Sequence, residues 1–527
     1  MNALRRVLLS MLLAFAASAV SAGKDIYVAQ TAQGANTGAS CPDAYVATFF
    51  NSASNWGSGA SQISPGTTVH ICGTITGGNG ATFFTFQGSG TSGNPITLLF
   101  EPGAVLQAPY LSTAGAIVAS GKSYITIDGG ANGLLESTLN GSSGAACPGG
   151  PCNSQQDSIG IKITNGANVT IQNLQVGPVY YRVNTEATSG AGTCVYLNNQ
   201  LHSGASNFLV QNNKIHDCSD AIFDFYGSSD GSIEIASNEI YRISGGFKPG
   251  QGSGSGSLTN VKFHDNNVHD WDNWDDFNIG YNNHHDSIQI YGGTGLTNCY
   301  VWNNYFHGSF GYGTTPGLYL DNTGTGSYTC TVFNNLFNIT ASGVGGDGAF
   351  TPQNEGGGPV TINAYNNTLI GANVGLTAFW FSGSSVTGDV RNNIVSGWNF
   401  GLYITNGANS PTISNHNSWS LAGGDLFAQG SAQFSTLSAW TSATGLDANS
   451  SSIVPNLNST TLVPQPGSPV IGLGQNLTSL CAGVLSALCA DKNGVLRPGS
   501  GAWDAGAYVS GSSSSVVPPT GLRATVF

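Results

Sequence analysis

The most regular feature of the chain is a short alternation of apolar and polar residues that ends in asparagine. Each run is too short for a helix, and its period of two is typical of a β-strand with one buried face. The steps between successive runs vary from 25 to 37 residues from Asn213 onward. The runs end at Asn173, Asn213, Asn238, Asn267, Asn304, Asn335, Asn367 and Asn393. A unit of this length cannot bury its apolar side alone, whereas stacked copies can.

A second strand pattern follows each asparagine corner. It occurs as DSIGIKI, CVYL, DAIFDF, DSIQIY, GLYLDN, GLTAFWF and GLYITN. An asparagine at the same corner of every coil tolerates the left-handed turn, and it can hydrogen-bond to the next coil. A β-sandwich or propeller is the alternative, but the drifting period and the single strand per repeat favour a solenoid. We therefore predict an all-β chain folded as a single-stranded right-handed parallel β-helix.

The ten cysteines predict disulfides between neighbours in the sequence. Cys299 and Cys330 each lie five residues before the last asparagine of a corner, so stacking brings them into adjacent coils. A zinc site is the alternative, but the chain has no CxxC doublet. The expected cysteines are Cys41, Cys72, Cys147, Cys152, Cys194, Cys218, Cys299, Cys330, Cys481 and Cys489.

The two ends of the chain resemble those of the secreted bacterial pectate-lyase-like β-helix superfamily. The resemblance rests on DIYVA from Asp25, SPGTTVHICGT from Ser64, and GSPVIGLG followed by DKNGVLRPGSGAWDAGAY near the C-terminus. Where this closing pattern often has Asp, the chain has Gly472. The resemblance implies the fold but does not specify a reaction.

Composition and charge narrow the cellular setting. Residues 1–22 read as a signal peptide, with two arginines before an apolar stretch, so we expect a secreted protein, extracellular or periplasmic. Residues 23–130 are expected to form an N-terminal cap and the first coils, residues 131–510 the β-helix with its C-terminal cap, and residues 511–527 a flexible tail. A net charge of −13 with only 14 Lys plus Arg argues against nucleic-acid and membrane partners. We expect a monomer with a polysaccharide as its partner.

An enlarged turn between Asn267 and Asp286 concentrates acidic, histidine and aromatic residues. Long loops on a rigid scaffold often carry binding and catalytic groups, although a solvated acidic loop is the plain alternative. Trp271 and Trp274 are predicted to bind substrate there, because exposed tryptophans are costly unless something packs on them. Carboxylates in the turn offer hard oxygen ligands for Ca²⁺. The expected metal ligands are Asp272, Asp275 and Asp276.

Aligned second strands place Asp157, Asp220 and Asp286 in one column. Asp220 and Asp286 would be separated by one coil, and two steps of ~4.8 Å place them about 9–10 Å apart. That is near the separation at which one carboxyl acts as general acid and the other activates water. Asp321 is the reserve candidate. A turn-capping role is the alternative for each aspartate alone.

Further residues complete the expected site. His285 is expected to assist catalysis, and His284 is expected to bind substrate, because successive side chains of a strand point to opposite sides. Tyr291, Tyr319 and Gln289 are the other expected substrate contacts. The leading hypothesis is a secreted glycoside hydrolase that needs no cofactor, with Asp286 and Asp220 as its acid/base pair.

Lys248 supports a different reaction. It lies in the coil between Asp220 and Asp286, where a basic residue with Ca²⁺ would suit β-elimination of a polyuronate. The family resemblance implies such a lysine or arginine base in several members. A Ca²⁺-assisted polyuronate lyase is therefore the second hypothesis, and a non-catalytic glycan-binding surface β-helix is the third.

Overall fold

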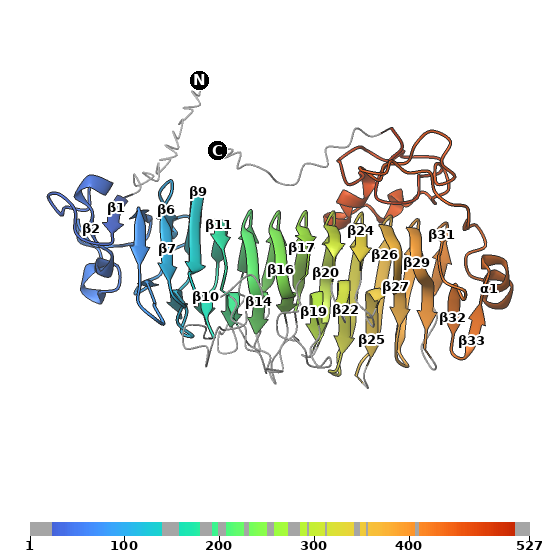
Figure 1. Ribbon diagram of the computed structural model, residues 1–527, viewed down its shortest axis with the longest axis horizontal. Helices are drawn as coiled ribbons and strands as arrows, with labels where there is room; N and C mark the ends of the chain where they lie inside the picture. Colours follow the sequence, from blue (N-terminus) through green and yellow to red (C-terminus); the bar gives the residue numbers. More distant parts are fainter. Residues whose placement is uncertain are drawn as a thin grey trace, which may run out of the picture.

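The computed structural model describes residues 24–139, 157–179, 192–198, 207–225, 231–249, 258–271, 285–291, 295–310, 314–341, 348–354, 357–405 and 411–511. Within these ranges, all but one of the strand pairings between named strands are parallel, and each coil stacks on the next. The fold is a right-handed parallel β-helix, as predicted. Figure 1 shows the coils following one another along its long axis.

The strands form three faces along the stack, which we call faces A, B and C in the order in which each coil visits them. Face A holds the apolar runs that precede the asparagine corners. Its strands are β1 (Lys24–Ala29), β3 (Thr67–Cys72), β6 (Ile96–Phe100), the first parts of β9 (Ile125–Ser137) and β11 (Val169–Val176), β13 (Asn207–Gln211), β15 (Ser232–Ala236), β17 (Asn260–His264), β20 (Leu296–Trp302), β23 (Tyr328–Phe333), β26 (Val360–Tyr365), β28 (Val386–Arg391) and β30 (Ile413–Asn415).

Face B follows the asparagine corner. Its strands are β4 (Thr74–Thr76), β7 (Val105–Ala108), the second parts of β9 and β11, the first parts of β14 (Lys214–Phe225) and β16 (Glu239–Pro249), β18 (Asn267–His269), β21 (Tyr305–Ser309), β24 (Leu336–Ala341), the first parts of β27 (Thr368–Phe381) and β29 (Ile394–Ile404), and β31 (Ser418–Ser420).

Face C completes each coil and carries the second strand pattern of the sequence. Its strands are β5 (Phe84–Thr85), β8 (Ile117–Ser120), β10 (Ile159–Thr164), β12 (Thr193–Asn198), the second parts of β14 and β16, β19 (His285–Tyr291), β22 (Thr314–Asn322), β25 (Gly348–Asn354), the second parts of β27 and β29, and β32 (Phe427–Gln429).

A buried asparagine ladder joins the coils at the corner between faces A and B. In each step the side-chain oxygen of one asparagine accepts hydrogen bonds from the backbone N–H and the side-chain amide of the asparagine one coil earlier. Asn304, for example, donates to Asn335 Oδ1 at 3.1 and 3.0 Å. The ladder residues are Asn213, Asn238, Asn266, Asn304, Asn335, Asn367, Asn393 and Asn417.

The ladder differs from the predicted corners at two positions. Asn266, and not Asn267, occupies the column, and Leu174, and not Asn173, precedes Asn213 in it. The reason is that the corner uses two successive residues. The first adopts positive φ, as Asn173 and Asp265 do, and only the second points into the ladder.

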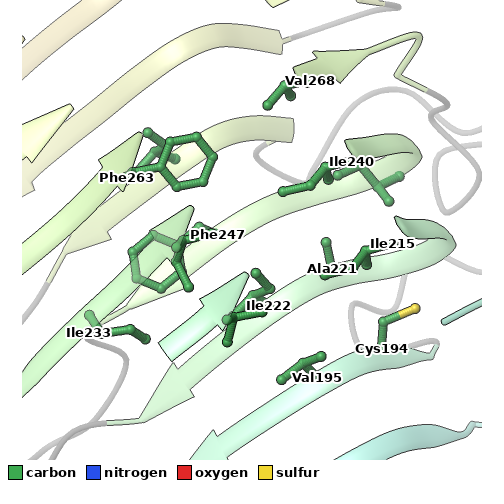
Figure 2. Close-up of a cluster of buried hydrophobic side chains, with 14 of the residues drawn as sticks. Cys194, Val195, Ile215, Ala221, Ile222, Ile233, Ile240, Phe247, Phe263 and Val268 are labelled. Atoms are coloured by element: carbon green, nitrogen blue, oxygen red, sulfur yellow. The ribbon is translucent and has the colours of Figure 1, made fainter. Parts of the chain in front are cut away.

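The interior is filled by the inward apolar side chains of all three faces. Figure 2 shows Ile215 and Ile222 of β14 in one coil, and Ile233 of β15 and Phe247 of β16 in the next, and all four are almost completely buried. On face C, the residues two positions after Asp220 and Asp286, Ile222 and Ile288, are both fully buried in this interior. This alternation is what orients the neighbouring side chains outward on face C.

Short helices and additional strands close the two ends. Near the N-terminus lie η1 (Cys41–Asp43), β2 (Tyr45–Val46), η2 (Ala47–Phe49) and η3 (Ala53–Asn55). At the other end lie β33 (Ala432–Phe434) and α1 (Leu437–Thr444), which is capped by Thr436 and ended by Gly445 at φ 74°. The buried Trp440 of α1 stacks on Phe427 of the last face C strand. None of the helices among the described residues is long and apolar enough to cross a membrane.

The C-terminal segment returns along the outside of the stack instead of only covering its end. Figure 1 shows it in red beside the yellow and orange coils. It contains η4 (Thr478–Leu480) and η5 (Gly483–Cys489), and it receives hydrogen bonds from the positive-φ corner residues Asn334, Asn366 and Asn392. Its apolar side chains cover the outward aromatic rings of Trp302, Phe333 and Tyr365.

Four of the five predicted disulfides are confirmed. They are Cys41–Cys72, Cys194–Cys218, Cys299–Cys330 and Cys481–Cys489. Cys299 and Cys330 are direct register partners in adjacent coils, as the repeat predicted. Cys147 and Cys152 lie outside the described residues, as do the predicted signal peptide and residues 512–527 of the expected tail.

Candidate functional site

The candidate site begins at the corner where β14 passes from face B to face C. Asp217 makes the corner with positive φ, and the Cys194–Cys218 disulfide fixes the next residue to the preceding coil. Ala221 and Ile222 then point into the core. Asp220 lies between the disulfide and these core residues, so its backbone is held from both sides. Its side chain keeps 14% exposure.

Lys248 meets Asp220 from the following coil. It is the direct register partner of Phe223, and its ammonium nitrogen lies 2.8 Å from Asp220 Oδ1. Gly245, the register partner of Asp220, makes this contact possible. A Cβ at Gly245 would overlap both the end of the Lys248 side chain and the Asp220 carboxylate. The Lys248 side chain therefore passes through the space that the Cβ of any residue other than glycine at position 245 would fill.

The expected column of Asp220 and Asp286 agrees with the strand register. Ile222, Phe247 and Ile288 are partners in three successive coils. Counting back two residues places Asp286 beside Gly245, and hence two coils beyond Asp220, with the coil of Gly245 between them. Asp286 is only 1% exposed, much less than Asp220. The two carboxylates share a column but differ in access to solvent.

Asp157 does not belong to this column. Ile159, Thr193 and Asp220 are register partners, which places Asp157 two residues earlier. The predicted alignment is wrong because DSIGI and DAIFD share a pattern but not a register. Asp157 nevertheless lies within electrostatic range of Asp220, and its backbone neighbour Gly192 donates to it at 3.2 Å. Burial raises the pKa of Asp157, and the nearby Asp220 charge raises it further.

The outward residues of face C form a second part of the site. Tyr291 lies within electrostatic range of both Lys248 and Asp220; burial raises its pKa, Lys248 opposes that effect and Asp220 adds to it. Asp321, the reserve catalytic candidate, is the register partner of Tyr291 and lies at the far end of β22. The residue of β22 that is the register partner of Asp286 is Thr315, and not Asp321. Asp321 is therefore separated from the Asp220–Lys248 pair by Tyr291.

Three predicted substrate contacts are largely withdrawn from solvent. Gln289 and Tyr319 are register partners on face C and are 7% and 5% exposed. Trp271 is 6% exposed, and its ring packs against Phe310 at a centroid distance of 5.7 Å and lies beside Gly246. Its position belongs to the core, and little of the ring is left for a ligand.

The remaining predicted residues cannot be placed. Trp274, His284, Asp272, Asp275 and Asp276 lie outside the described residues, as does the side chain of His285, whose backbone opens β19. Their roles stay predictions. Among the described residues, no group of three or more His, Cys, Asp or Glu side chains could hold a metal ion.

The structure adds residues that the sequence pattern did not single out. Gly245 is one, since its role depends on a side chain from three residues later. Asp224 is another: it shares a buried column with Leu197 and Pro249, its Oδ1 has no hydrogen-bond partner, and burial raises its pKa to about 7. The alignment of DAIFD singled out Asp220 alone, and the structure shows that Asp224 of the same strand is the more buried carboxylate.

Two solved structures show a similar course of the chain. One is a crystal structure of pectate lyase Pel9A, with 14% identity over 93% of this chain and 98% of its own length, and a TM-score of 0.36. The other is a rhamnogalacturonan lyase, with 12% identity over 75% of this chain and 88% of its own length, and a TM-score of 0.33. No protein-family model and no curated protein sequence matches the chain.

Proposed function

We propose that this protein is a secreted polysaccharide-degrading enzyme whose active centre is the Asp220–Lys248 pair on face C. The observation that carries the proposal is the pair itself, a carboxylate and an ammonium 2.8 Å apart and partly exposed. Tyr291 lies within electrostatic range of both groups, and outward side chains of face C continue the column of Lys248. A rigid solenoid face with such a row suits a linear polymer that contacts several coils at once.

The reaction that best fits this arrangement is β-elimination in a polyuronate. Lys248 in its uncharged form takes the proton from the sugar carbon that bears the carboxylate. A double bond then forms between that carbon and its neighbour while the neighbour's bond to the glycosidic oxygen breaks. Tyr291 supplies the proton to the leaving oxygen and is reprotonated from solvent, and no water is consumed. Ca²⁺ held by Asp272, Asp275 and Asp276 would neutralise the substrate carboxylate.

Hydrolysis is the second candidate, and the shared column of Asp220 and Asp286 favours it. Two coil steps correspond to about 9–10 Å, near the separation of inverting carboxylate pairs. The contact with Lys248 counts against it, because Asp220 would have to act as acid or base while paired with an ammonium. The burial of Asp286 also limits its reach to a glycosidic bond.

The first experiment is a panel of acidic and neutral polysaccharides with the purified protein, with Ca²⁺ and with EDTA. Reducing ends and the ultraviolet absorbance of unsaturated products are followed together. We expect both signals on an acidic polymer, with EDTA abolishing them. Reducing ends without new absorbance would transfer the proposal to the hydrolase. Absence of both, with glycan binding retained, would leave a non-catalytic binding module.

Two variants separate the reactions. Lys248→Ala abolishes elimination, whereas Lys262→Ala, which removes an equally short Lys–Glu contact of 2.8 Å on face A, is the matched control. Asp220→Asn abolishes hydrolysis because the acid/base pair is lost. In the lyase it instead moves the rising limb of the pH–rate profile to lower pH, because the anion that favours charged Lys248 is gone.

A further inference from the structure

The outward column that contains Lys248 continues towards the N-terminal end of face C. Phe223 is its partner in the preceding coil, Tyr196 is the partner of Phe223, and Lys162 is the partner of Tyr196. We call Lys162, Tyr196 and Phe223 the Lys162 row. All three side chains are partly exposed. The row therefore extends the candidate site by three coils without a change of register.

On the C-terminal side of Lys248, the side chains of the same column are buried. Its next members are Gln289, Tyr319 and Thr351, with exposures of 7%, 5% and 1%. Partly exposed side chains return only at Trp380 and Tyr403, in the coils of β27 and β29. A polymer that reaches Lys248 along this column can therefore follow it continuously only towards the N-terminal end.

The chemistry of the Lys162 row fits an acidic polymer. The Lys162 ammonium lies 5.0 Å from the centre of the Tyr196 ring and 3.2 Å from the carbonyl oxygen of Thr113. The Tyr196 and Phe223 rings stack on each other at 5.6 Å, so they present their edges, and the Tyr196 hydroxyl, to a ligand. Lys162 and Lys248 are three coil steps apart, about 14 Å. A chain with carboxylates on several sugar units can contact both cations at once.

We propose that the Lys162 row binds the acidic polysaccharide on one side of the bond that is broken, with Lys162 holding a substrate carboxylate. This inference rests on the proposed function of the Asp220–Lys248 pair and gives that site a direction. Oligosaccharides long enough to span three coils gain the Lys162 contact, whereas shorter ones do not. Residues on the C-terminal side, such as Trp380, contribute nothing to binding.

The test measures binding of acidic oligosaccharides of graded length to Lys248→Ala protein by calorimetry, so that turnover does not interfere. In this background, Lys162→Met weakens binding of the long oligosaccharides about tenfold or more and leaves the disaccharide unchanged, since a charge-assisted contact is lost. Lys214→Met is the matched control, because Lys214 lies over the Tyr241 ring at 5.4 Å on face B. Trp380→Ala tests the opposite side.

Several results would overturn the proposal. Equal weakening of binding by Lys162→Met and Lys214→Met would show that the effect comes from net charge alone. A greater loss of affinity from Trp380→Ala would show that the polymer binds on the C-terminal side instead. If the protein cleaves acidic polymers but Lys162→Met does not change oligosaccharide binding, the proposed function stands and the Lys162 row is not a binding site. Length-dependent binding that needs Lys162, without cleavage by the wild type, would support the Lys162 row as a binding site and contradict the proposed enzymatic function.

Discussion

At the scale of single residues, the candidate site depends on a glycine, Gly245, whose lack of a side chain leaves room for the ion pair. Gly245→Ala would place a methyl group against the flexible ends of Lys248 and Asp220, and its three nearest atoms all belong to these two side chains. We therefore expect the ion pair to move apart while the fold remains. Turnover should fall about 10- to 100-fold, because small displacements of catalytic groups are costly. Steady-state kinetics and thermal unfolding, measured on the same preparation, check both parts.

Gly424→Ala is the control for this change. A Cβ at Gly424 has nothing within 4 Å, so its effect on turnover should be nil. If Gly245→Ala keeps the fold and leaves turnover unchanged, then the lysine does not act from the position that it occupies here.

The asparagine ladder gives a second prediction for single residues. Asn335 accepts two hydrogen bonds from Asn304 and donates to Asn367 Oδ1 and to the Val301 carbonyl, and all of these groups are buried. Asn335→Ala leaves several of them unpaired, at about 1–3 kcal/mol each. We expect the free energy of unfolding to fall by about 3 kcal/mol or more in urea denaturation. Asn207→Ala, at an exposed hydrogen bond on face A, should change it by less than about 0.5 kcal/mol.

At the scale of elements, face B carries a stack of rings across successive coils. His216, Tyr241, His269 and His307 are register partners, with centroid distances of 4.9, 5.0 and 4.7 Å. Glu239 and Asp270 hold the pKa of His269 above its ordinary value, against the effect of burial. Burial and the neighbouring His269 lower the pKa of His307 to about 4. We therefore expect His269 to carry a proton at pH values at which the stacked His307 is still neutral.

This stack predicts a loss of stability in acid. Between its ordinary pKa of 6.5 and its folded-state pKa of about 4, His307 binds a proton in the unfolded chain but not in the folded one. Stability should therefore fall as the pH drops from about 6.5 towards about 4, by on the order of 2–3 kcal/mol. His269 acts in the opposite sense, because its raised pKa stabilises the fold in acid and this contribution is lost as the pH rises. Urea unfolding of His307→Asn at several pH values should show a shallower acid loss than the wild type, and an identical slope would contradict the assignment.

The elements were also where prediction from sequence worked best, for a physical reason. Alternation with a period of two and a repeated corner residue are local signals, and both follow directly from strand geometry. The register at the corners is less accessible, because Asn, Ser, Asp and His all occur at the positive-φ position before the ladder. In HDNN the sequence does not reveal which asparagine points inward, and in DSIGI it does not reveal the offset of Asp157. The Asp220–Lys248 contact required Gly245, which a pattern of side chains does not report.

At the scale of the whole molecule, the C-terminal segment joins coils that are far away in sequence. Asn334 donates to the Ala490 carbonyl, and Arg497 donates to Asn334 Oδ1 and the Gly506 carbonyl. Burial lowers the pKa of Arg497 to about 10. No periodicity in residues 456–511 indicates this return path, because its contacts follow the outside of the stack and not the repeat. The segment covers outward aromatic rings that a solenoid face would otherwise expose to water.

Trp503 is the residue through which this segment is best tested. It is fully buried among Trp302, Phe333 and Tyr365, with its indole N–H donating to the Pro498 carbonyl at 2.7 Å. Trp503→Ala should lower the free energy of unfolding by about 3–5 kcal/mol, and it should expose enough apolar surface to bind a hydrophobic dye. Because Asp220 and Lys248 lie on face C, turnover at low temperature should be unaffected. Loss of stability together with loss of turnover would instead show that the segment supports the active face through the core, and that the stack responds as one cooperative unit.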